Sequence, residues 1–380
     1  MADMQMTDET LSYFEEHRQQ AYDLLLELSQ IPAPSNHEEK RAQFCKDWLE
    51  KQGCQGVYID DVLNVVWPVG CTHSNELVIY MAHSDVVFPD TQPLPLKVED
   101  GKIFCPGVGD DTANVVALMM TAKYIAQKGL QPVDTGLLLV INSGEEGLGN
   151  LKGSRRIMED FGSRVREFVT FDGYAPGMAN TMVGSKRYKV EVATEGGHSY
   201  GAFGNRNAIA YLASLINTLY EIKVPNRGKT TFNVGTISGG TSVNTIAQYA
   251  EMLYEFRSDN REDLAQMEEH FKAAIAFYQT KGIEVTVTQV GDRPCMGDVD
   301  ATREQALMER GARAIKNHFG YDVGYHSGST DCNIPMSMGI PAICLGAVEG
   351  GKAHTREEYV VIDSLLPGLK VAAEMILHHF

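Results

Sequence analysis

Apolar runs that suit β-strands alternate with segments of helical spacing in the first half of the chain. Residues 112–129 and 150–162 carry apolar side chains at the three- and four-residue intervals of a helix. Strands and helices in alternation are typical of α/β folds, in which a mostly parallel sheet carries helices on both faces. Ligands of such sheets gather beyond the carboxyl ends of the strands. The runs that predict strands cover residues 64–69, 76–85, 135–146 and 167–174.

A second pattern interrupts this alternation. Between residues 184 and 293 the predicted elements follow the order strand, helix, strand, strand, helix, strand, as in a ferredoxin-like α/β sandwich. The chain then returns to helices and an apolar strand, so an insertion is the simplest topology. A chain of 380 residues also exceeds the size at which one hydrophobic core usually stops growing. We therefore expect one domain built from residues 1–183 and 294–380, interrupted by a smaller domain at 184–293.

The charge of the chain argues against nucleic acid and membrane partners. Fifty acidic and 33 basic residues give a formal net charge of -17, which repels phosphate backbones and anionic lipids. No apolar run reaches the length of a membrane span, and the first residues lack the pattern of a secretory signal. The seven cysteines are scattered and form no CxxC pair, so they predict reduced thiols. We expect a cytoplasmic protein.

Polar residues stand where the predicted strands end. In "YMAHSD", Asp85 follows His83 by two residues and can fix the tautomer of the imidazole, as carboxylates behind metal-binding histidines do. A solvated pair at a strand end is the alternative. The neighbours Glu145 and Glu146 are tolerable if water solvates both. They are also compatible with a site in which a cation neutralises one carboxylate while the other moves protons.

Further acids and one histidine extend this set. Asp110 and Asp111 lie in a loop that opens an apolar helix, where an N-cap with favourable helix-dipole charge is the alternative interpretation. Asp172 ends the next strand, and His354 lies in a Gly-rich loop near the C-terminus, a position equally compatible with an exposed histidine. Carboxylates with imidazole suit zinc, manganese or cobalt. A single Asp that bridges two cations would account for the number of acids.

Six motifs together resemble a known family in order and spacing. They are "HSD" at 83, "GVGDD" at 107, "SGEEG" at 143, "FDG" at 171, "GGHSYGAFGNRNAI" at 196 and "AHTREEYV" at 353. They resemble the dinuclear zinc peptidases, a family that includes peptidase T, aminoacylases and glutamate carboxypeptidases, over nearly the whole chain. The resemblance implies a zinc-exopeptidase-like α/β catalytic domain with an inserted ferredoxin-like lid (dimerisation) domain. The "GDD" run favours enzymes of the peptidase T type.

The resemblance also implies a role for each residue of the main site. It gives the chain two Zn²⁺ ions, with Co²⁺ or Mn²⁺ as alternatives, and a water between them that Glu145 activates as general base. Asp85 supports His83 in this arrangement. Thr112 and Ala113 stand where relatives often have Lys and Gly, a departure that removes no ligand. The implied metal ligands are His83 and Asp172 on one ion, Glu146 and His354 on the other, and Asp110 on both.

Three residues of the inserted domain are implied to act on the substrate. His198 is expected to donate a hydrogen bond to the developing oxyanion, in relatives often from the partner subunit of a dimer. Without the resemblance it is an ordinary loop histidine. Asn244 and Arg257 are expected to hold the substrate, Arg257 through a carboxylate, and a surface ion pair with Asp259 is the alternative for Arg257.

These observations lead to a functional hypothesis. We expect a cytoplasmic, homodimeric metallopeptidase that hydrolyses an amide bond in small peptides, as a di- or tripeptidase or an aminopeptidase. An N-acyl-amino-acid amidohydrolase or a carboxypeptidase of the same fold is the alternative. A non-catalytic relative that binds peptides would be favoured by the loss of a ligand or of the base, and the sequence retains them all.

Overall fold

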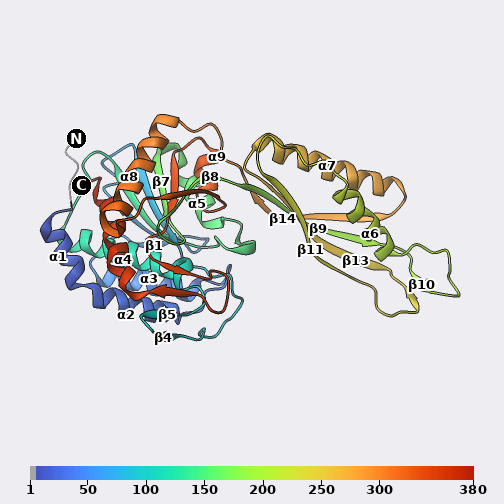
Figure 1. Cartoon of the computed structure of the whole chain (residues 1–380), viewed down its shortest axis with the longest axis horizontal. Helices are drawn as coiled ribbons and strands as arrows, with labels where there is room; N and C mark the ends of the chain where they lie inside the picture. Colours follow the sequence, from blue (N-terminus) through green and yellow to red (C-terminus); the bar gives the residue numbers. More distant parts are fainter. Residues whose placement is uncertain (1–5) are drawn as a thin grey trace. The chain divides into compact units, whose positions relative to one another are not determined.

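The computed structural model describes residues 6–380, which form two compact units (Figure 1). The main unit consists of residues 6–182 and 298–380, and the inserted unit is Val183–Gly297. The insertion therefore begins one residue before, and ends four residues after, the range expected from the sequence.

The main unit is built on an eight-stranded mixed sheet with the order β1-β2-β6-β3-β7-β16-β8-β15. Its four central strands, β6, β3, β7 and β16, run parallel to one another. Strand β2 runs antiparallel to β6, and β8 runs antiparallel to β16. The predicted α/β fold with a mostly parallel sheet is confirmed. The strands are β1 (Tyr58–Ile59), β2 (Val65–Val69), β3 (Leu77–His83), β6 (Gly136–Asn142), β7 (Val165–Phe171), β8 (Gly177–Met182), β15 (Gly324–Gly328) and β16 (Ala342–Leu345).

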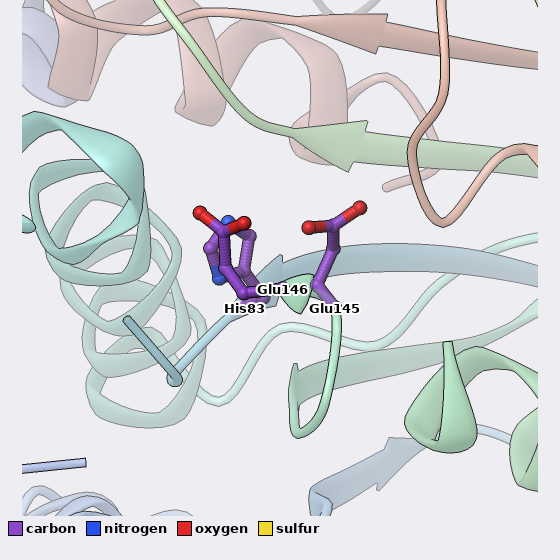
Figure 2. A group of neighbouring side chains, drawn as sticks. All are labelled: His83, Glu145 and Glu146. Atoms are coloured by element: carbon purple, nitrogen blue, oxygen red, sulfur yellow. The ribbon is translucent and has the colours of Figure 1, made fainter. Parts of the chain in front are cut away.

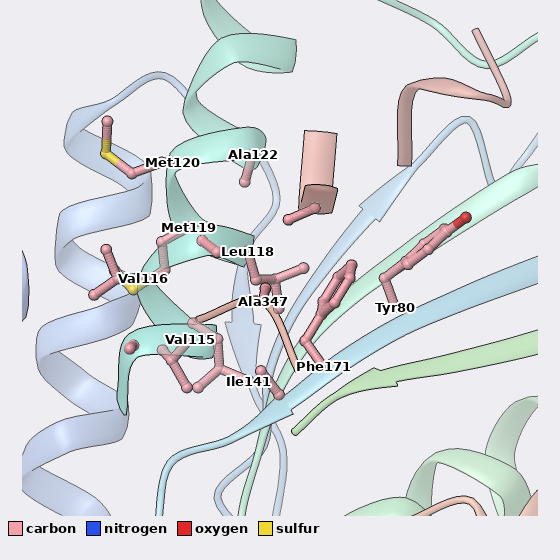
Figure 3. Packing of buried hydrophobic residues seen from close by; sticks show 14 of the residues in the cluster. Tyr80, Val115, Val116, Leu118, Met119, Met120, Ala122, Ile141, Phe171 and Ala347 are labelled. Carbon is pink, nitrogen blue, oxygen red and sulfur yellow. The ribbon is translucent and has the colours of Figure 1, made fainter. Parts of the chain in front are cut away.

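Both faces of the central strands are buried. Every residue of β3 and β6 is buried, which is why these segments read as continuous apolar runs rather than as alternating ones. On one face, Tyr80, Ile141 and Phe171 pack in one cluster with the apolar side chains of α4 (Figure 3). The helices of the main unit are α1 (Asp8–Glu16), α2 (Arg18–Ser29), α3 (Glu39–Lys51), α4 (Ala113–Lys128), α5 (Lys152–Phe161), α8 (Ala301–Phe319), α9 (Asn333–Ser337) and α10 (Leu365–Leu377).

Helix α4 is the central helix of this core. All of its residues from Ala113 to Ile125 are buried, because α2 and α10 pack against it on the sides that the sheet leaves open. The helix ends at Gly129, whose φ of 61° gives the left-handed C-cap that favours glycine. The loop that precedes this buried helix contains Asp110.

The polar residues that follow the central strands meet at one edge of the sheet. His83 ends β3 and is in register with Asn142, the last residue of β6, while Asp172 directly follows β7. Beside them lies a small antiparallel sheet with the order β17-β18-β5-β4. Its strands are β4 (Lys97–Glu99), β5 (Lys102–Phe104), β17 (Gly350–Gly351) and β18 (Tyr359–Val361).

The inserted unit has the ferredoxin-like order of elements. Its four long strands form an antiparallel sheet in the order β11-β13-β9-β14, and the two helices pack on one face of it. Side chains of β9 alternate between this core, which takes Tyr188 and Val190, and the opposite face. The elements are β9 (Gly184–Ala193), β10 (Gly197–His198), α6 (Ala208–Tyr220), β11 (Thr230–Gly239), β12 (Thr245–Ile246), β13 (Tyr249–Ser258), α7 (Arg261–Thr280) and β14 (Glu284–Arg293).

Two further expectations concern the chain as a whole. No helix among residues 6–380 has both the length and the apolar character needed to cross a membrane. All seven cysteines lie in the described part of the chain and are free, and six of them are buried.

Candidate metal centre

One carboxylate faces two histidines at the edge of the main sheet. Asp110 Oδ1 lies 3.0 Å from His83 Nε2, and its Oδ2 lies 3.1 Å from His354 Nε2. Asp172 Oδ1 is 3.9 Å from the same nitrogen of His83, and Glu146 Oε1 is 2.8 Å from that of His354. Each oxygen of Asp110 therefore belongs to a different group of side chains.

These groups have the donor atoms and the spacing of metal ligands. His83, Asp110 and Asp172 offer ligand atoms that all lie within 4.8 Å of one another, and so do Asp110, Glu146 and His354. Ligand atoms on one tetrahedral zinc ion, with bonds of ~2.0–2.2 Å, lie about 3.3 Å apart. Two imidazoles and three carboxylates therefore fit a pair of divalent cations that share Asp110.

The electrostatics of the cluster agree with this interpretation. Burial and the negative charge of Asp110 raise the pKa of Asp172 to about 7. Hydrogen bonds with Asp110 and Glu146 raise the pKa of His354 to about 11. The acids are crowded enough that one resists ionisation and a histidine is drawn into its charged form. A divalent cation would neutralise the same carboxylates and leave the imidazole nitrogens as ligands.

Glu145 and Glu146 occupy a tight turn after β6. Glu145 is 5% exposed, and its carboxylate offers a ligand atom that lies within 4.8 Å of one from the imidazole of His83 and one from the carboxylate of Glu146 (Figure 2). Gly144 precedes the pair with a φ of 64°, and a Cβ there would lie 2.6 Å from the side chain of Lys152. The turn therefore requires glycine, and it allows both neighbouring carboxylates to reach the cluster.

The carboxylate of Asp85 accepts hydrogen bonds from this turn rather than from the imidazole of His83. Its Oδ1 and Oδ2 accept hydrogen bonds from the backbone N–H groups of Glu145 at 3.0 Å and Glu146 at 2.9 Å, and Ser35 donates to Oδ2 at 2.6 Å. The nearest acceptor to His83 Nδ1 is the backbone oxygen of Asp85 at 3.0 Å, while the carboxylate is 3.6 Å away. We expected the carboxylate to fix the tautomer of His83. In the structure the carbonyl oxygen is better placed to do so.

Three residues outside the predicted ligand set also support the cluster. Asp111 Oδ2 accepts a hydrogen bond from the backbone N–H of His83 at 2.8 Å. Asn114 donates to the other oxygen of Asp111 at 2.6 Å and accepts from the N–H of Ala347 at 2.8 Å. The third residue, Glu358, is buried against the loop of Asp110. Asp111 and Glu358 lie within the motifs "GVGDD" and "AHTREEYV", whereas Asn114 had no sequence signal.

Arg41 is a fourth such residue, and the sequence did carry a signal for it. It lies on the buried face of α3, four residues before Cys45, where an apolar side chain would be ordinary. Its guanidinium donates to the backbone oxygens of Ile31 at 2.7 Å and Ser84 at 2.8 Å. It also donates to Thr112 Oγ1 at 3.2 Å, so the threonine that departs from the family pattern has a partner. Arg41 thereby joins three loops around the cluster.

The inserted unit brings two of its three predicted residues together. His198 in β10 is in register with Thr245 in β12, and the N–H of Ser199 donates to the backbone oxygen of Asn244 at 2.9 Å. Arg257 lies instead near the far end of β13. It forms an ion pair, as the alternative interpretation expected, but the partner is Glu255 at 3.0 Å rather than Asp259.

The family model of peptidase family M20/M25/M40 matches residues 79–378, which is most of the chain. This protein is a member of that family. The M20 membership confirms the family expected from the six motifs and makes the chain a hydrolase.

Individual M20 relatives are distant in sequence but similar along their full length. Succinyl-diaminopimelate desuccinylase of Corynebacterium glutamicum is 25% identical over 89% of this chain and 91% of its own. A tripeptidase structure from Staphylococcus aureus has a TM-score of 0.74 at 22% identity and covers 96% of this chain and 99% of its own. A dinuclear metal binding peptidase from Bacillus subtilis has a TM-score of 0.67 at 16% identity, with coverage of 96% and 98%. At these identities the structures show a shared fold.

Proposed function

We propose that this chain is a dinuclear metallopeptidase that hydrolyses an amide bond in small peptides, as peptidase T-like di- and tripeptidases or aminopeptidases do. The observation that carries the proposal is the position of Asp110, with one oxygen beside each of two histidines. A mononuclear catalytic site needs three protein ligands, whereas this carboxylate and the four candidate ligands around it make five. The similarity to structures of a tripeptidase and a dinuclear peptidase supports it.

Five side chains would hold the two ions. Zn²⁺ is the expected metal, with Co²⁺ or Mn²⁺ as alternatives. When bound, such ions polarise the amide carbonyl and make water a stronger acid. The proposed ligands are His83 and Asp172 for one ion, Glu146 and His354 for the other, and Asp110 for both.

The chain itself would then move the proton. Glu145 Oε is close to both groups of ligands and would take a proton from the attacking water and deliver it to the leaving amine. Its position is fixed because Asp85 accepts the Glu145 N–H. Glu146, the next residue along the chain, would act as a ligand and not as a base. Glu145 and Glu146 can have different roles because each backbone N–H donates to a different oxygen of Asp85, which fixes the two residues individually.

His198 would supply the oxyanion donor from the inserted unit, which acts as a lid. Its Nδ1 accepts hydrogen bonds from the backbone N–H groups of Tyr200 and Gly201, both at 3.2 Å. A neutral imidazole that accepts at Nδ1 carries its proton at Nε2, which makes that exposed nitrogen a donor. We propose that Asn244, its neighbour, and Arg257 contact the substrate. We also propose a cytoplasmic homodimer that forms through the lid.

A second candidate function rests on the similarity to the desuccinylase. That relative is named for removing a succinyl group from an amino acid, which is also the hydrolysis of an amide bond. The same ligands and base would serve an N-acyl-amino-acid amidohydrolase, because the two activities differ in what lies beyond the scissile amide.

A mixed substrate assay separates these functions. The zinc-loaded protein is incubated with di- and tripeptides, with the same peptides N-acetylated, and with N-acetyl and N-succinyl amino acids, and the products are identified by mass spectrometry. We expect cleavage of peptides with free amines, complete loss of cleavage after chelation, and recovery when Zn²⁺ is restored. Cleavage of the acylated amino acids alone would favour the second function. Two tightly bound ions without any cleavage would contradict both.

His198→Ala should lower kcat by ~10²–10³-fold while metal content and KM change little, because an oxyanion donor acts on the transition state. The measurement combines steady-state kinetics with metal analysis. The lid residue Arg206→Ala serves as a control, since this exposed side chain pairs with Glu195 and lies outside the proposed site.

The same variant tests whether His198 acts across the dimer. Mixing inactive His198→Ala chains with inactive Glu145→Gln chains should restore part of the activity, since some hybrid dimers then hold one site with both residues intact. Subunit exchange that is verified by mass spectrometry but restores no activity would show that His198 works within its own chain or not in catalysis.

A further inference from the structure

A buried carboxylate, Glu358, holds the loop that carries Asp110. Its Oε1 accepts hydrogen bonds from the backbone N–H groups of Gly109 at 2.9 Å and Asp110 at 2.8 Å. Its Oε2 accepts from the N–H of Gly107 at 2.7 Å, and the Tyr174 hydroxyl donates to Oε1 at 3.2 Å. Glu358 has no exposed surface, and within the described residues each of these donors is neutral. Neighbouring N–H groups that point to one place form a concavity that binds anions, and here the chain's own side chain fills it.

The fold explains how Glu358 reaches this loop. Tyr359 begins β18 and pairs with Phe104, the last residue of β5. The N–H of Cys105 donates to the backbone oxygen of Glu358 at 3.2 Å, which continues the ladder by one step. The Asp110 loop leaves β5 at this point, so the side chain of Glu358 extends into it.

The same residue closes the loop of His354. Glu358 follows His354 by four residues, and its N–H donates to the backbone oxygen of Thr355 at 3.3 Å. His354 has a φ of 62°, in the left-handed region that side chains other than glycine rarely adopt. Such a conformation persists only where the surrounding structure fixes it. Glu358 therefore connects two loops, each of which presents one side chain to the same candidate cation.

The other candidate cation depends less on this connection. His83 is held by its own strand, by Asp111 at its N–H and by the carbonyl oxygen of Asp85 at Nδ1. Asp172 directly follows β7 and donates its N–H to Leu345 at 3.1 Å. Neither residue lies in the loops that Glu358 joins.

We propose that Glu358 is a positioning residue that sets the affinity of the cation held by Asp110, Glu146 and His354, with a smaller effect on the cation at His83. The inference rests on the proposed dinuclear site. It adds a determinant of that site that contacts neither the cation nor the substrate. The carboxylate acts by fixing the distance between the Asp110 loop and the His354 loop.

Glu358→Gln is the direct test. The glutamine has the same shape, but its NH₂ group replaces one acceptor oxygen and opposes at least one backbone N–H of the loop. We expect the Kd of one Zn²⁺ ion to rise by ~10–100-fold, the usual effect of losing an outer partner of a metal ligand, while the other ion changes by much less. Zn²⁺ binding is measured by competition with a chromophoric chelator, and circular dichroism reports the fold. Glu357→Gln, at the exposed neighbouring position, should bind both ions as the unaltered protein does.

Each outcome has a distinct meaning. The proposal would be overturned if a folded Glu358→Gln protein bound both ions with unchanged affinity. It would also be overturned if the variant lost affinity equally for both ions, whatever the change in its thermal stability. If this variant does not fold, Tyr174→Phe removes one donor to Glu358 and should weaken the same single ion, and unchanged Zn²⁺ binding would again overturn the proposal. The unaltered protein is titrated in parallel. If it binds fewer than two ions, the dinuclear site is wrong, and the role of Glu358 in it is wrong as well.

Discussion

Asp110→Asn is expected to remove both metal ions and, with them, all measurable hydrolysis. Each oxygen of Asp110 faces a different histidine, so a single substitution affects both groups of ligands. The amide offers one uncharged oxygen in place of two negative ones, and hard divalent cations bind it less well. We expect both dissociation constants to rise by more than the ~10–100-fold that follows the loss of an outer partner. Equilibrium dialysis followed by elemental analysis measures the loss.

Comparison with other aspartates makes this result specific. Asp322→Asn, at a position whose side chain is 92% exposed, should leave both ions bound. Asp172→Asn should weaken one ion more than the other, because Asp172 belongs to one group of ligands. If Asp110→Asn also lost only one ion, Asp110 would be an ordinary ligand and the bridge would be wrong.

Glu145→Gln is expected to retain both ions and lose ~10²–10⁴-fold in kcat, the usual cost of removing a general base. The glutamine keeps the size of the side chain and cannot accept the proton. The backbone N–H at this position still donates to Asp85, so the turn should keep its shape. Stopped assays with a tripeptide, combined with metal analysis of the same sample, give both quantities.

Glu146→Gln is the matched partner of this variant. It lies one residue further along, its N–H donates to the same carboxylate, and its Oε1 is 2.8 Å from His354. We expect this variant to lose metal first and to regain part of its activity at high Zn²⁺ concentration. Equal metal loss in the two variants would show that the division between base and ligand is wrong.

The sequence predicted the parts of the site that follow directly from buried strands. His83, Glu145 and Asp172 each stand where an apolar run stops, and strands that are parallel bring such positions to one edge of a sheet. Asp110 precedes an apolar helix and could be placed near them on the same reasoning. His354 came from the resemblance alone, because a histidine in a Gly-rich loop carries no periodic signal.

The residues that support the ligands were harder to predict. Glu358 meets Gly107 across 251 positions of the chain, and this contact depends on the pairing of two strands of only three residues each. The carboxylate of Asp85 was expected beside the imidazole, but the turn of Glu145 offers it two N–H groups. Local sequence patterns indicate which residues follow the end of a strand. They do not indicate from which of several nearby donors a buried carboxylate accepts its hydrogen bonds.

The two ends of the inserted unit lie side by side, because Ser185 at the start of β9 is in register with Arg293 at the end of β14. All five proposed ligands and the proposed base belong to the main unit, whose sheet is complete without the insertion. The inserted unit is therefore joined to the main unit through two adjacent chain segments. A foreign ferredoxin-like domain with equally close ends could be spliced between residues 182 and 298, which would leave the proposed metal ligands and base in place but remove His198, the proposed oxyanion donor.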